Sequence, residues 1–280
     1  MQKKFGIPIA AEAVSWQFQH RLYMRQMGML IPSTISPAAL QSVLDAPCGP
    51  GSWAIDLAKA YPAIKVIGVD SHPEMVRMAQ ENAGNMKLGN VSFVVHRLLD
   101  PFPYDDASFD FIHIQRGTMF IAPQHWPSII AELLRLLRPN GWLNLIDFEP
   151  GITSSPAVDR FATLVGKAMA KAGRSLTPDG NFMTPAVLFP RYLTQAGCLD
   201  VRYMLYPLNL GGWNNPYGRG YGQALLSDST HVGIFLIQMG VATQSELDDL
   251  FAKMHQEMQQ MDYCGTGTLI SVIGRKPATP

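Results

Sequence analysis

Short apolar runs alternate with segments of helical periodicity through the middle of the chain. The apolar runs occupy residues 42–45, 66–70, 91–95, 109–114 and 142–148. Each run has the length of one strand, and the segments between consecutive runs leave room for helices. This alternation favours right-handed crossovers and a parallel sheet that is covered by helices on both faces. The pattern therefore predicts the α/β class.

The flanking regions predict further helices and two more strands. Helical patterns cover residues 10–30, 157–172, 185–196 and 243–261, and strand patterns cover residues 200–208 and 267–274. The last of these helices begins with Thr243 and Glu246, which together form the pattern of a capping box. Its apolar face is rich in methionine, which indicates a packing surface. A substrate-lining surface or a dimer surface is the alternative, because methionine adapts to irregular shapes.

The first two apolar runs carry the most informative residues. The first run ends at Asp45 and leads into a turn that contains Gly49 and Gly51, and the second run ends at Asp70. A strand, a glycine turn, a helix and a second strand that ends in an acid are typical of nucleotide binding, with the acid on the ribose. Glycine lets a ligand approach the backbone closely. Residues 52–54 supply no third glycine, so the spacing disfavours a nicotinamide dehydrogenase.

Residues 45–51 resemble motif I of the class I S-adenosylmethionine-dependent methyltransferases, of the small-molecule, UbiE-like type. Residues 101–113 and 133–143 resemble the segments that lead into the fourth and fifth strands of this family. The resemblance thus covers roughly residues 40–150 in the right order. It implies a Rossmann-like sheet of seven strands, mostly parallel with an antiparallel final strand. It also implies S-adenosyl-L-methionine as cofactor and S-adenosyl-L-homocysteine as product.

The resemblance also implies which residues hold the cofactor. Asp70 binds the ribose hydroxyls, and Met75 packs on the adenine. Ser71 is also assigned to the cofactor, and it is expected to cap the helix that follows, with Glu74 completing a capping box. The other positions that it assigns to the cofactor are Asp45, Ala46, Cys48, Gly49, Gly51, Leu98, Gln115 and Arg116, the last two also bordering the substrate.

Two positions depart from the family pattern. Pro47 replaces the first glycine that is common in motif I, which stiffens the turn. His96 and Arg97 stand where the family usually places an acid that accepts a hydrogen bond from the adenine amine. Arginine has no acceptor to offer. Stacking together with hydrogen bonds from the backbone around Leu98 is then expected to hold the adenine, or the carboxylate of Asp100 replaces the missing acid.

The segments outside the motifs predict a lid over the substrate. We expect a helical cap at 1–40, the methyltransferase core at 41–208, a lid insertion at 209–262, and the final strand with the tail at 263–280. Aromatic residues in these segments and near the fourth strand predict a partly apolar substrate pocket, lined by Trp16, Tyr23, Trp126, Trp213, Tyr217 and Tyr221. His20 and His231 are the candidate general bases, although most histidines in such positions are structural.

Composition and charge exclude several other classes of protein. Lys and Arg total 22, as do Asp and Glu, so the chain lacks the basic excess of a nucleic-acid-binding protein. No apolar stretch is long enough to span a membrane, and the first residues do not resemble a secretory signal. Three widely spaced cysteines predict a reduced, cytoplasmic protein without disulfides or a metal site. The expected partner is a small-molecule substrate, and a homodimer is a candidate assembly.

The leading hypothesis is a methyltransferase that acts on a small, partly apolar metabolite at oxygen, nitrogen or carbon. A natural-product tailoring step or the methylation of a quinone-like ring fits this description. One alternative is an enzyme of the same fold that catalyses a rearrangement or cyclisation without consuming the cofactor. The other alternative is a non-catalytic nucleotide-binding module, which the His96–Arg97 pair favours.

Overall fold

The structure is a computed structural model that describes residues 9–180, 185–212, 222, 225 and 232–278. The chain divides into two compact units. The first, here the helical unit, comprises Met1–Leu22, Phe148–Pro185 and Tyr206–Leu269. The second, here the sheet unit, comprises Tyr23–Asp147, Ala186–Leu205 and Ile270–Pro280. Each unit is described by itself below.

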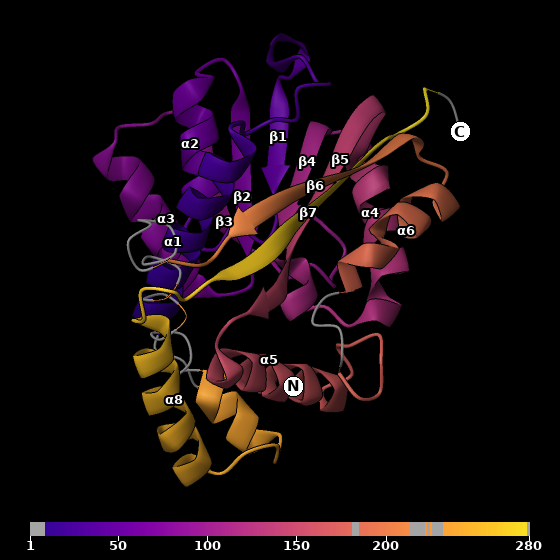
Figure 1. Ribbon diagram of the computed structural model, residues 1–280. Coiled ribbons are helices and arrows are strands. Elements are labelled where there is room, and N and C mark those ends of the chain that lie inside the picture. Colours follow the sequence, from indigo (N-terminus) through magenta and orange to yellow (C-terminus); the bar gives the residue numbers. More distant parts are fainter. Residues whose placement is uncertain (1–8, 181–184, 213–221, 223–224, 226–231, 279–280) are drawn as a thin grey trace. The chain divides into compact units, whose positions relative to one another are not determined.

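A seven-stranded sheet has the strand order β3-β2-β1-β4-β5-β7-β6 (Figure 1). Its strands are β1 (Ser42–Asp45), β2 (Lys65–Asp70), β3 (Val91–Val95), β4 (Phe109–Gln115), β5 (Leu137–Thr153), β6 (Leu199–Asn209) and β7 (Gly265–Arg275). The pairings β1–β2, β1–β4, β2–β3 and β4–β5 are parallel. The pairings β5–β7 and β7–β6 are antiparallel. The predicted α/β class, with a mostly parallel sheet and an antiparallel final strand, is confirmed.

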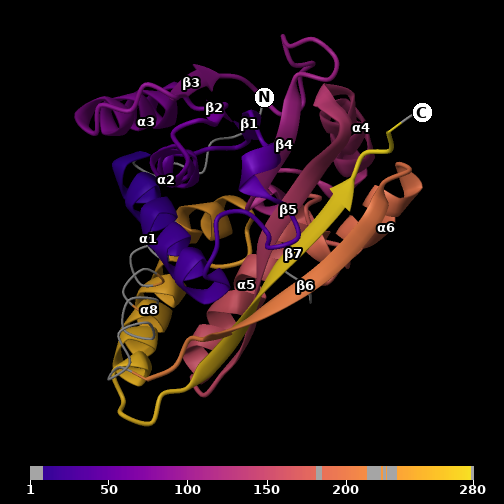
Figure 2. The same cartoon turned by 90° about the horizontal axis from the view of Figure 1, so that it is seen from above.

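Helices cover both faces of the sheet within the sheet unit (Figure 2). Phe111 of β4 packs into a core cluster with buried residues of α2 (Ser52–Ala60) and α3 (Pro73–Asn85). Ile112 and Ile114 belong to the other cluster, with α4 (Trp126–Leu136) and α6 (Phe189–Gln195). Successive side chains of a strand point to opposite faces, so β4 supplies both cores.

Short 3-10 helices complete the sheet unit at Pro37–Ala39, Gly117–Met119 and Pro123–His125. The helix expected at 185–196 is divided into a 3-10 turn at Pro185–Leu188 and α6. The fifth strand was expected at 142–148 and extends further at both ends, with an irregularity in its pairing opposite Phe109 and Phe111. Asn140 there donates its backbone N–H to the carbonyl oxygen of Lys276 at 3.1 Å. This bond to the residue that follows β7 keeps the polar segment before Trp142 in the sheet.

The helical unit contains α5 (Pro156–Lys171) and α8 (Gln244–Met258), which pack against each other. The rings of Phe161 and Phe251 meet edge to face, with centroids 5.8 Å apart. A carboxylate oxygen of Glu257 accepts hydrogen bonds from the hydroxyl of Ser155 at 2.6 Å and from the backbone N–H of Ala157 at 3.0 Å. A charged acceptor from α8 thus caps the start of α5.

The helix over residues 243–261 starts as predicted and has the predicted packing face. Thr243 and Glu246 form the capping box. Met254 and Met258 are buried, whereas Met261 lies past the helix end and is exposed. The helix α1 (Ile9–Met27) passes from the helical unit into the sheet unit along the chain. None of the helices in the described ranges is long and apolar enough for a membrane span.

Candidate functional site

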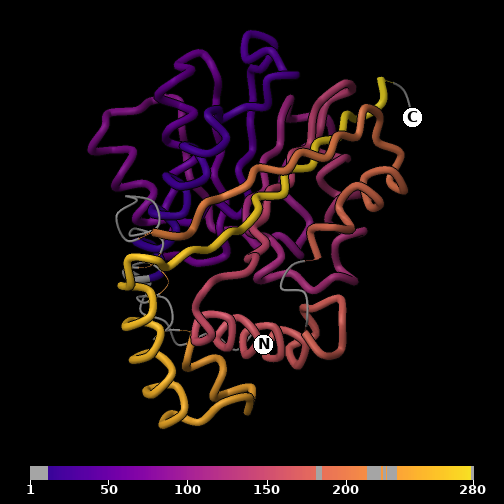
Figure 3. Tube along the Cα trace, in the orientation of Figure 1, coloured from indigo at the N-terminus to yellow at the C-terminus, as the bar shows by residue number. Residues whose placement is uncertain are grey.

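The carboxyl ends of β1, β2 and β4 lie side by side in the sheet unit. Asp45 at the end of β1 pairs in register with Gly68 of β2 and with His113 of β4. The turn at residues 46–51 leaves β1 at this edge and leads into α2, as the chain trace shows (Figure 3). In parallel sheets this edge is where ligands bind. The sequence motifs are therefore brought together as predicted.

The carboxylate of Asp70 joins the glycine turn to the start of α3. One oxygen accepts a hydrogen bond from the backbone N–H of Gly49 at 3.0 Å, and the other accepts one from the backbone N–H of His72 at 2.8 Å. Asp70 is only 7% exposed. A carboxylate oxygen has two lone pairs, so each oxygen of Asp70 has the capacity to accept a second donor such as a hydroxyl.

Gly51 is required by the protein's own packing as well as by the turn. Its φ is +84°, which favours glycine, and it is the N-cap residue of α2. A Cβ at this position would lie 2.8 Å from the Cβ of Ala79 and 2.8 Å from the ring of Phe93. The glycine therefore allows the turn to approach α3 and β3. From the sequence, we had expected the glycine only to let a ligand approach the backbone.

Asp45 is a buried acid beside a second acid. Burial raises the pKa of the Asp45 carboxyl well above its usual range, and the charge of Asp70 raises it further, while a hydrogen bond from the Ala54 backbone lowers it. Its Oδ2 atom has no hydrogen-bond partner within the described part of the chain. A buried acceptor without a donor is costly, so this atom fits a ligand that brings a donor or a positive charge.

Cys48 fills space in the turn. It is 4% exposed, and burial raises the pKa of its thiol, with Asp45 and Asp70 adding to the effect. Its backbone N–H donates to the carbonyl oxygen of Val69 at 2.8 Å, and the N–H of the neighbouring Ala46 donates to that of His113 at 2.9 Å. A neutral buried thiol is a poor nucleophile. Cys48 therefore serves the shape of the turn.

The expected helix cap at Ser71 is wrong. The N-cap of α3 is His72, whose Nδ1 accepts a hydrogen bond from the backbone N–H of Glu74 at 3.3 Å. Pro73 occupies the first helical position, where its fixed φ and missing N–H are tolerated, so the residue before it becomes the cap. The Glu74 side chain pairs with Arg77 instead of closing a capping box. Met75 is 2% exposed in the first turn of α3.

The residues after β3 form a compact turn. The backbone N–H of His96 donates to the carbonyl oxygen of Asp70 at 2.9 Å, and the ring of His96 lies 4.4 Å from that of Phe102. Arg97 faces solvent, with its Nε 3.9 Å from a carboxylate oxygen of Asp100. Leu98 is partly buried against the core cluster of β4 and α4. The place after β3 is thus filled by a tilted pair of rings and a partly buried leucine.

The residues after β4 include a buried acceptor and a turn tied to β5. Gln115 is 5% exposed, and among the described residues none hydrogen-bonds its Oε1. Arg116 has a φ of +61° and donates its backbone N–H to Ile146 at 2.9 Å. Thr118 donates both its backbone N–H, at 3.0 Å, and its hydroxyl, at 2.6 Å, to one carboxylate oxygen of Asp147.

Asp147 was missed from the sequence, although a signal was present. It lies near the end of the fifth apolar run, as Asp45 and Asp70 end the first two. It is 3% exposed, and its bonds to Thr118 hold the turn that follows Gln115. An acid at the carboxyl end of another parallel strand was therefore a candidate for this edge.

The expected substrate residues lie in several places. In the sheet unit, Tyr23 is buried, and Trp126 is fully buried with its ring 4.7 Å from that of Phe189. In the helical unit, Trp16 and His20 are buried on α1. The remaining expected residues, Trp213, Tyr217, Tyr221 and His231, lie outside the described residues. All these assignments to substrate or catalysis stay predictions. No group of His, Cys, Asp and Glu in the described ranges could hold a metal ion.

Comparisons with known proteins agree with this geometry. The sequence profile of a family described as "Methyltransferase domain" matches residues 43–141. Methyltransferase str2 of Strobilurus tenacellus is 28% identical over 174 residues, which cover 59% of each chain. Demethylmenaquinone methyltransferase of Deinococcus radiodurans is 35% identical over 108 residues, 39% of this chain and 43% of that one. The chain spans about half the length of the curated relatives that it matches.

Solved structures share the fold over most of the chain. The YcgJ protein of Bacillus subtilis superposes with a TM-score of 0.56 at 20% identity, covering 92% of this chain and 99% of that one. The matched profile spans β1 to the start of β5, with the glycine turn and Asp70 between them. The motifs and the strand order agree with these matches: residues 43–141 of the chain are similar to the methyltransferase-domain family, and the fold is that of the solved structure.

Proposed function

We propose that this protein transfers a methyl group from S-adenosyl-L-methionine to a small, partly apolar metabolite. The observation that carries the proposal is the Asp70 carboxylate, which is bound to Gly49 and His72 at the carboxyl edge of the sheet. Both of these bonds come from backbone groups, so the carboxylate is held in one place at this edge. A ribose with two hydroxyl donors suits such a group.

The buried acceptors near the turn fit the rest of this cofactor. S-Adenosyl-L-methionine carries a sulfonium and an ammonium group, and the sulfonium methyl is what it supplies when bound. Asp45 and Gln115 each present a buried oxygen without a donor among the described residues. We assign the ammonium end of the cofactor to this acidic, polar part of the site, the ribose to Asp70, and the adenine to the side of Met75 and Leu98.

The protein's contribution to the reaction is alignment and the exclusion of water. Positive charge disperses as the methyl group moves in line from sulfur to the acceptor, so a dry and well-aligned site favours the transfer. A general base is needed only if the acceptor must lose a proton. His20 and His231 are our candidates for that role, with Ser71 and Arg116 bordering the site.

The acceptor is proposed to be a small molecule rather than a macromolecule. Equal numbers of basic and acidic residues disfavour nucleic acid as a partner. The curated relatives include a methyltransferase that acts on demethylmenaquinone, as its name states. A ring of this kind or a natural-product intermediate fits the aromatic residues expected in the lid. A homodimer and a cytoplasmic location stay predictions.

One incubation separates this proposal from its rivals. Purified protein is incubated with labelled S-adenosyl-L-methionine and a panel of phenols, quinols and amines, and S-adenosyl-L-homocysteine and methylated product are measured. Methyl transfer requires the two to form in equal amounts. Conversion of an acceptor while the cofactor stays intact would instead indicate a rearrangement or cyclisation. Absence of cofactor binding by calorimetry would leave only a non-catalytic module.

A further inference from the structure

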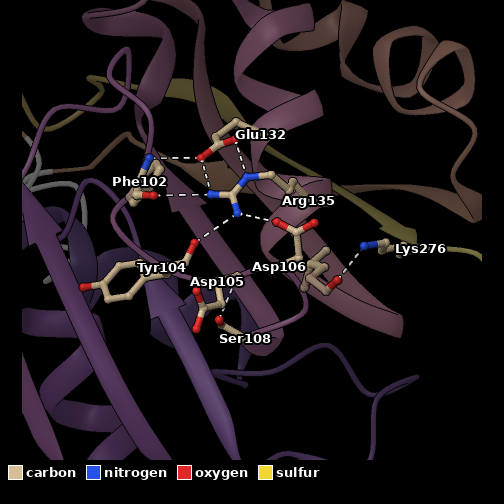
Figure 4. Close-up of polar contacts among 9 residues, drawn as sticks. Phe102, Tyr104, Asp105, Asp106, Ser108, Glu132, Arg135 and Lys276 are labelled. Carbon is tan, nitrogen blue, oxygen red and sulfur yellow. Dashed lines mark hydrogen bonds and ion pairs between the residues drawn. The ribbon is translucent and has the colours of Figure 1, made fainter.

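The side chain of Arg135 in α4 binds the connection between β3 and β4 at several points. Figure 4 shows the guanidinium of Arg135 surrounded by acceptors from this connection and from α4 itself. Its five N–H groups have five hydrogen bonds, to the two carboxylate oxygens of Glu132 at 2.8 and 2.7 Å, to Asp106 at 2.6 Å, and to the carbonyl oxygens of Tyr104 at 3.0 Å and Phe102 at 3.3 Å. Every donor of the fork is therefore used.

Glu132 binds the second backbone group of Phe102. Its Oε1 accepts the backbone N–H of Phe102 at 3.0 Å, while Arg135 binds the carbonyl oxygen of the same residue. The hydrogen bond from Arg135 lowers the pKa of the Glu132 carboxyl, so Glu132 is held in its charged form. Both backbone groups of Phe102 are thus bound by charged side chains of α4, which makes these bonds stronger than neutral ones.

Phe102 in turn contacts the carboxyl edge of the sheet. Its ring is 4% exposed and lies 4.4 Å from the ring of His96. His96 follows β3 directly and is bound through its backbone N–H to the carbonyl oxygen of Asp70. A continuous set of contacts therefore leads from Arg135 through Phe102 and His96 to the residue that we propose to bind the ribose.

We propose that Arg135 is a positioning residue for the purine end of the cofactor, acting through Phe102 and His96. This inference rests on the proposed function. A lysine would keep the charge, but its ammonium is a point donor with three N–H groups and cannot span five acceptors in a plane. Loss of the fork would free Phe102 and loosen the turn over residues 96–102, on which the purine side of the site depends.

Arg138 provides a matched control. Its Nη1 binds both carboxylate oxygens of Asp110, at 2.8 and 2.9 Å, and its Nε donates to the carbonyl oxygen of Ala107 at 3.2 Å, close to the start of β4. Asp110 accepts the backbone N–H groups of Gln41 and Ser42 and lies near the start of β4. This second arginine clamp is therefore at the amino edge of the parallel strands, opposite to the site. An R138K variant loses the bonds to Asp110 and Ala107, and neither of these bonds involves Phe102.

The full-length wild type, R135K and R138K are compared in binding of S-adenosyl-L-homocysteine and of adenosine by calorimetry, and in thermal unfolding. Both variants are expected to unfold at lower temperature. Only R135K is expected to bind both ligands about tenfold more weakly, the effect of losing one well-placed charged hydrogen bond. Once a methyl acceptor has been identified, R135K is expected to have a higher KM for S-adenosyl-L-methionine than the wild type and nearly the same kcat.

A second variant keeps the test informative if R135K folds poorly. F102L removes the ring on His96 and retains both backbone groups that Glu132 and Arg135 bind, so it is expected to weaken adenosine binding as R135K does. The double variant R135K/F102L is expected to bind adenosine about as tightly as whichever single variant binds it less tightly. The two effects are not additive, because Arg135 acts on the site through Phe102. Equal weakening in R135K and R138K, or unchanged binding in R135K, would overturn the positioning role. A wild type that binds neither ligand would overturn the proposed function itself.

Discussion

The backbone N–H of Gly49 lies 3.0 Å from a carboxylate oxygen of Asp70, so the acid at the end of β2 holds the turn that follows β1. The same acid holds the start of α3 through His72. Asp70 is therefore both part of the scaffold and the residue proposed to bind the ribose. This double role means that its loss affects the shape of the site and the ligand contact together.

Replacing Asp70 by Ala is expected to weaken cofactor binding by about 1.5–3 kcal/mol, because charge-assisted hydrogen bonds to the ribose are lost. Calorimetric titration with S-adenosyl-L-homocysteine measures the effect. Asp105→Ala, which removes an exposed carboxylate from the connection before β4, is the control and is expected to bind as the wild type does. An Asp70→Ala variant of unchanged affinity would contradict the placement of the ribose.

Gly51→Ala is expected to destabilise the fold by about 2 kcal/mol or more, because the new Cβ meets Ala79 and Phe93 and the φ of +84° disfavours a side chain. Urea unfolding measures the free energy of unfolding. Gly84→Ala in α3 has nothing within 4 Å of its new Cβ and serves as the matched control. It is expected to stabilise the protein slightly, by roughly 0.5–1 kcal/mol. Equal effects of the two changes would show that position 51 tolerates a side chain.

Asp45→Asn is expected to make the free energy of unfolding less dependent on pH. The pKa of Asp45 is raised in the folded state, so the folded protein binds a proton that the unfolded chain has released. The wild type therefore loses stability as the pH rises from about 4, the ordinary value for Asp, toward the raised folded pKa. Asparagine does not titrate, so the free energy of unfolding of the variant increases relative to that of the wild type as the pH rises through this range. Parallel stability curves from pH 4 to 8 would argue against a neutral Asp45.

The three cysteines are expected to differ sharply in reactivity. Burial raises the pKa of Cys48 and raises that of Cys198 to about 11, whereas Cys264 is exposed. Alkylation proceeds through the thiolate, so brief treatment of the native protein with iodoacetamide should label Cys264 first. Peptide mass spectrometry reads the order of labelling, and urea-unfolded protein, in which all three react, is the control. Early labelling of Cys48 would show that the turn opens.

Much of the fold was determined by local pattern. The strands Ser42–Asp45 and Val91–Val95 have the predicted bounds, because short apolar runs between turn residues leave little choice of register. Thr243 and Glu246 cap their helix as their spacing predicts. These features depend on neighbours within a few positions of the chain, and such neighbours are visible in the sequence.

Long-range contacts decided most of the rest, and one local rule was overlooked. Pro73 occupies the first helical position of α3, so the cap is His72 and not Ser71 as the capping-box pattern predicted. The pairing of Thr118 with Asp147 and three of the five bonds of Arg135 join segments about thirty residues apart. The unpaired oxygen of Asp45 likewise becomes visible only when the elements around it are assembled. Hydrogen-bond partners and burial are properties of the folded chain, so only the tertiary structure revealed which polar groups are bound within the scaffold and which buried atoms have no partner among the described residues.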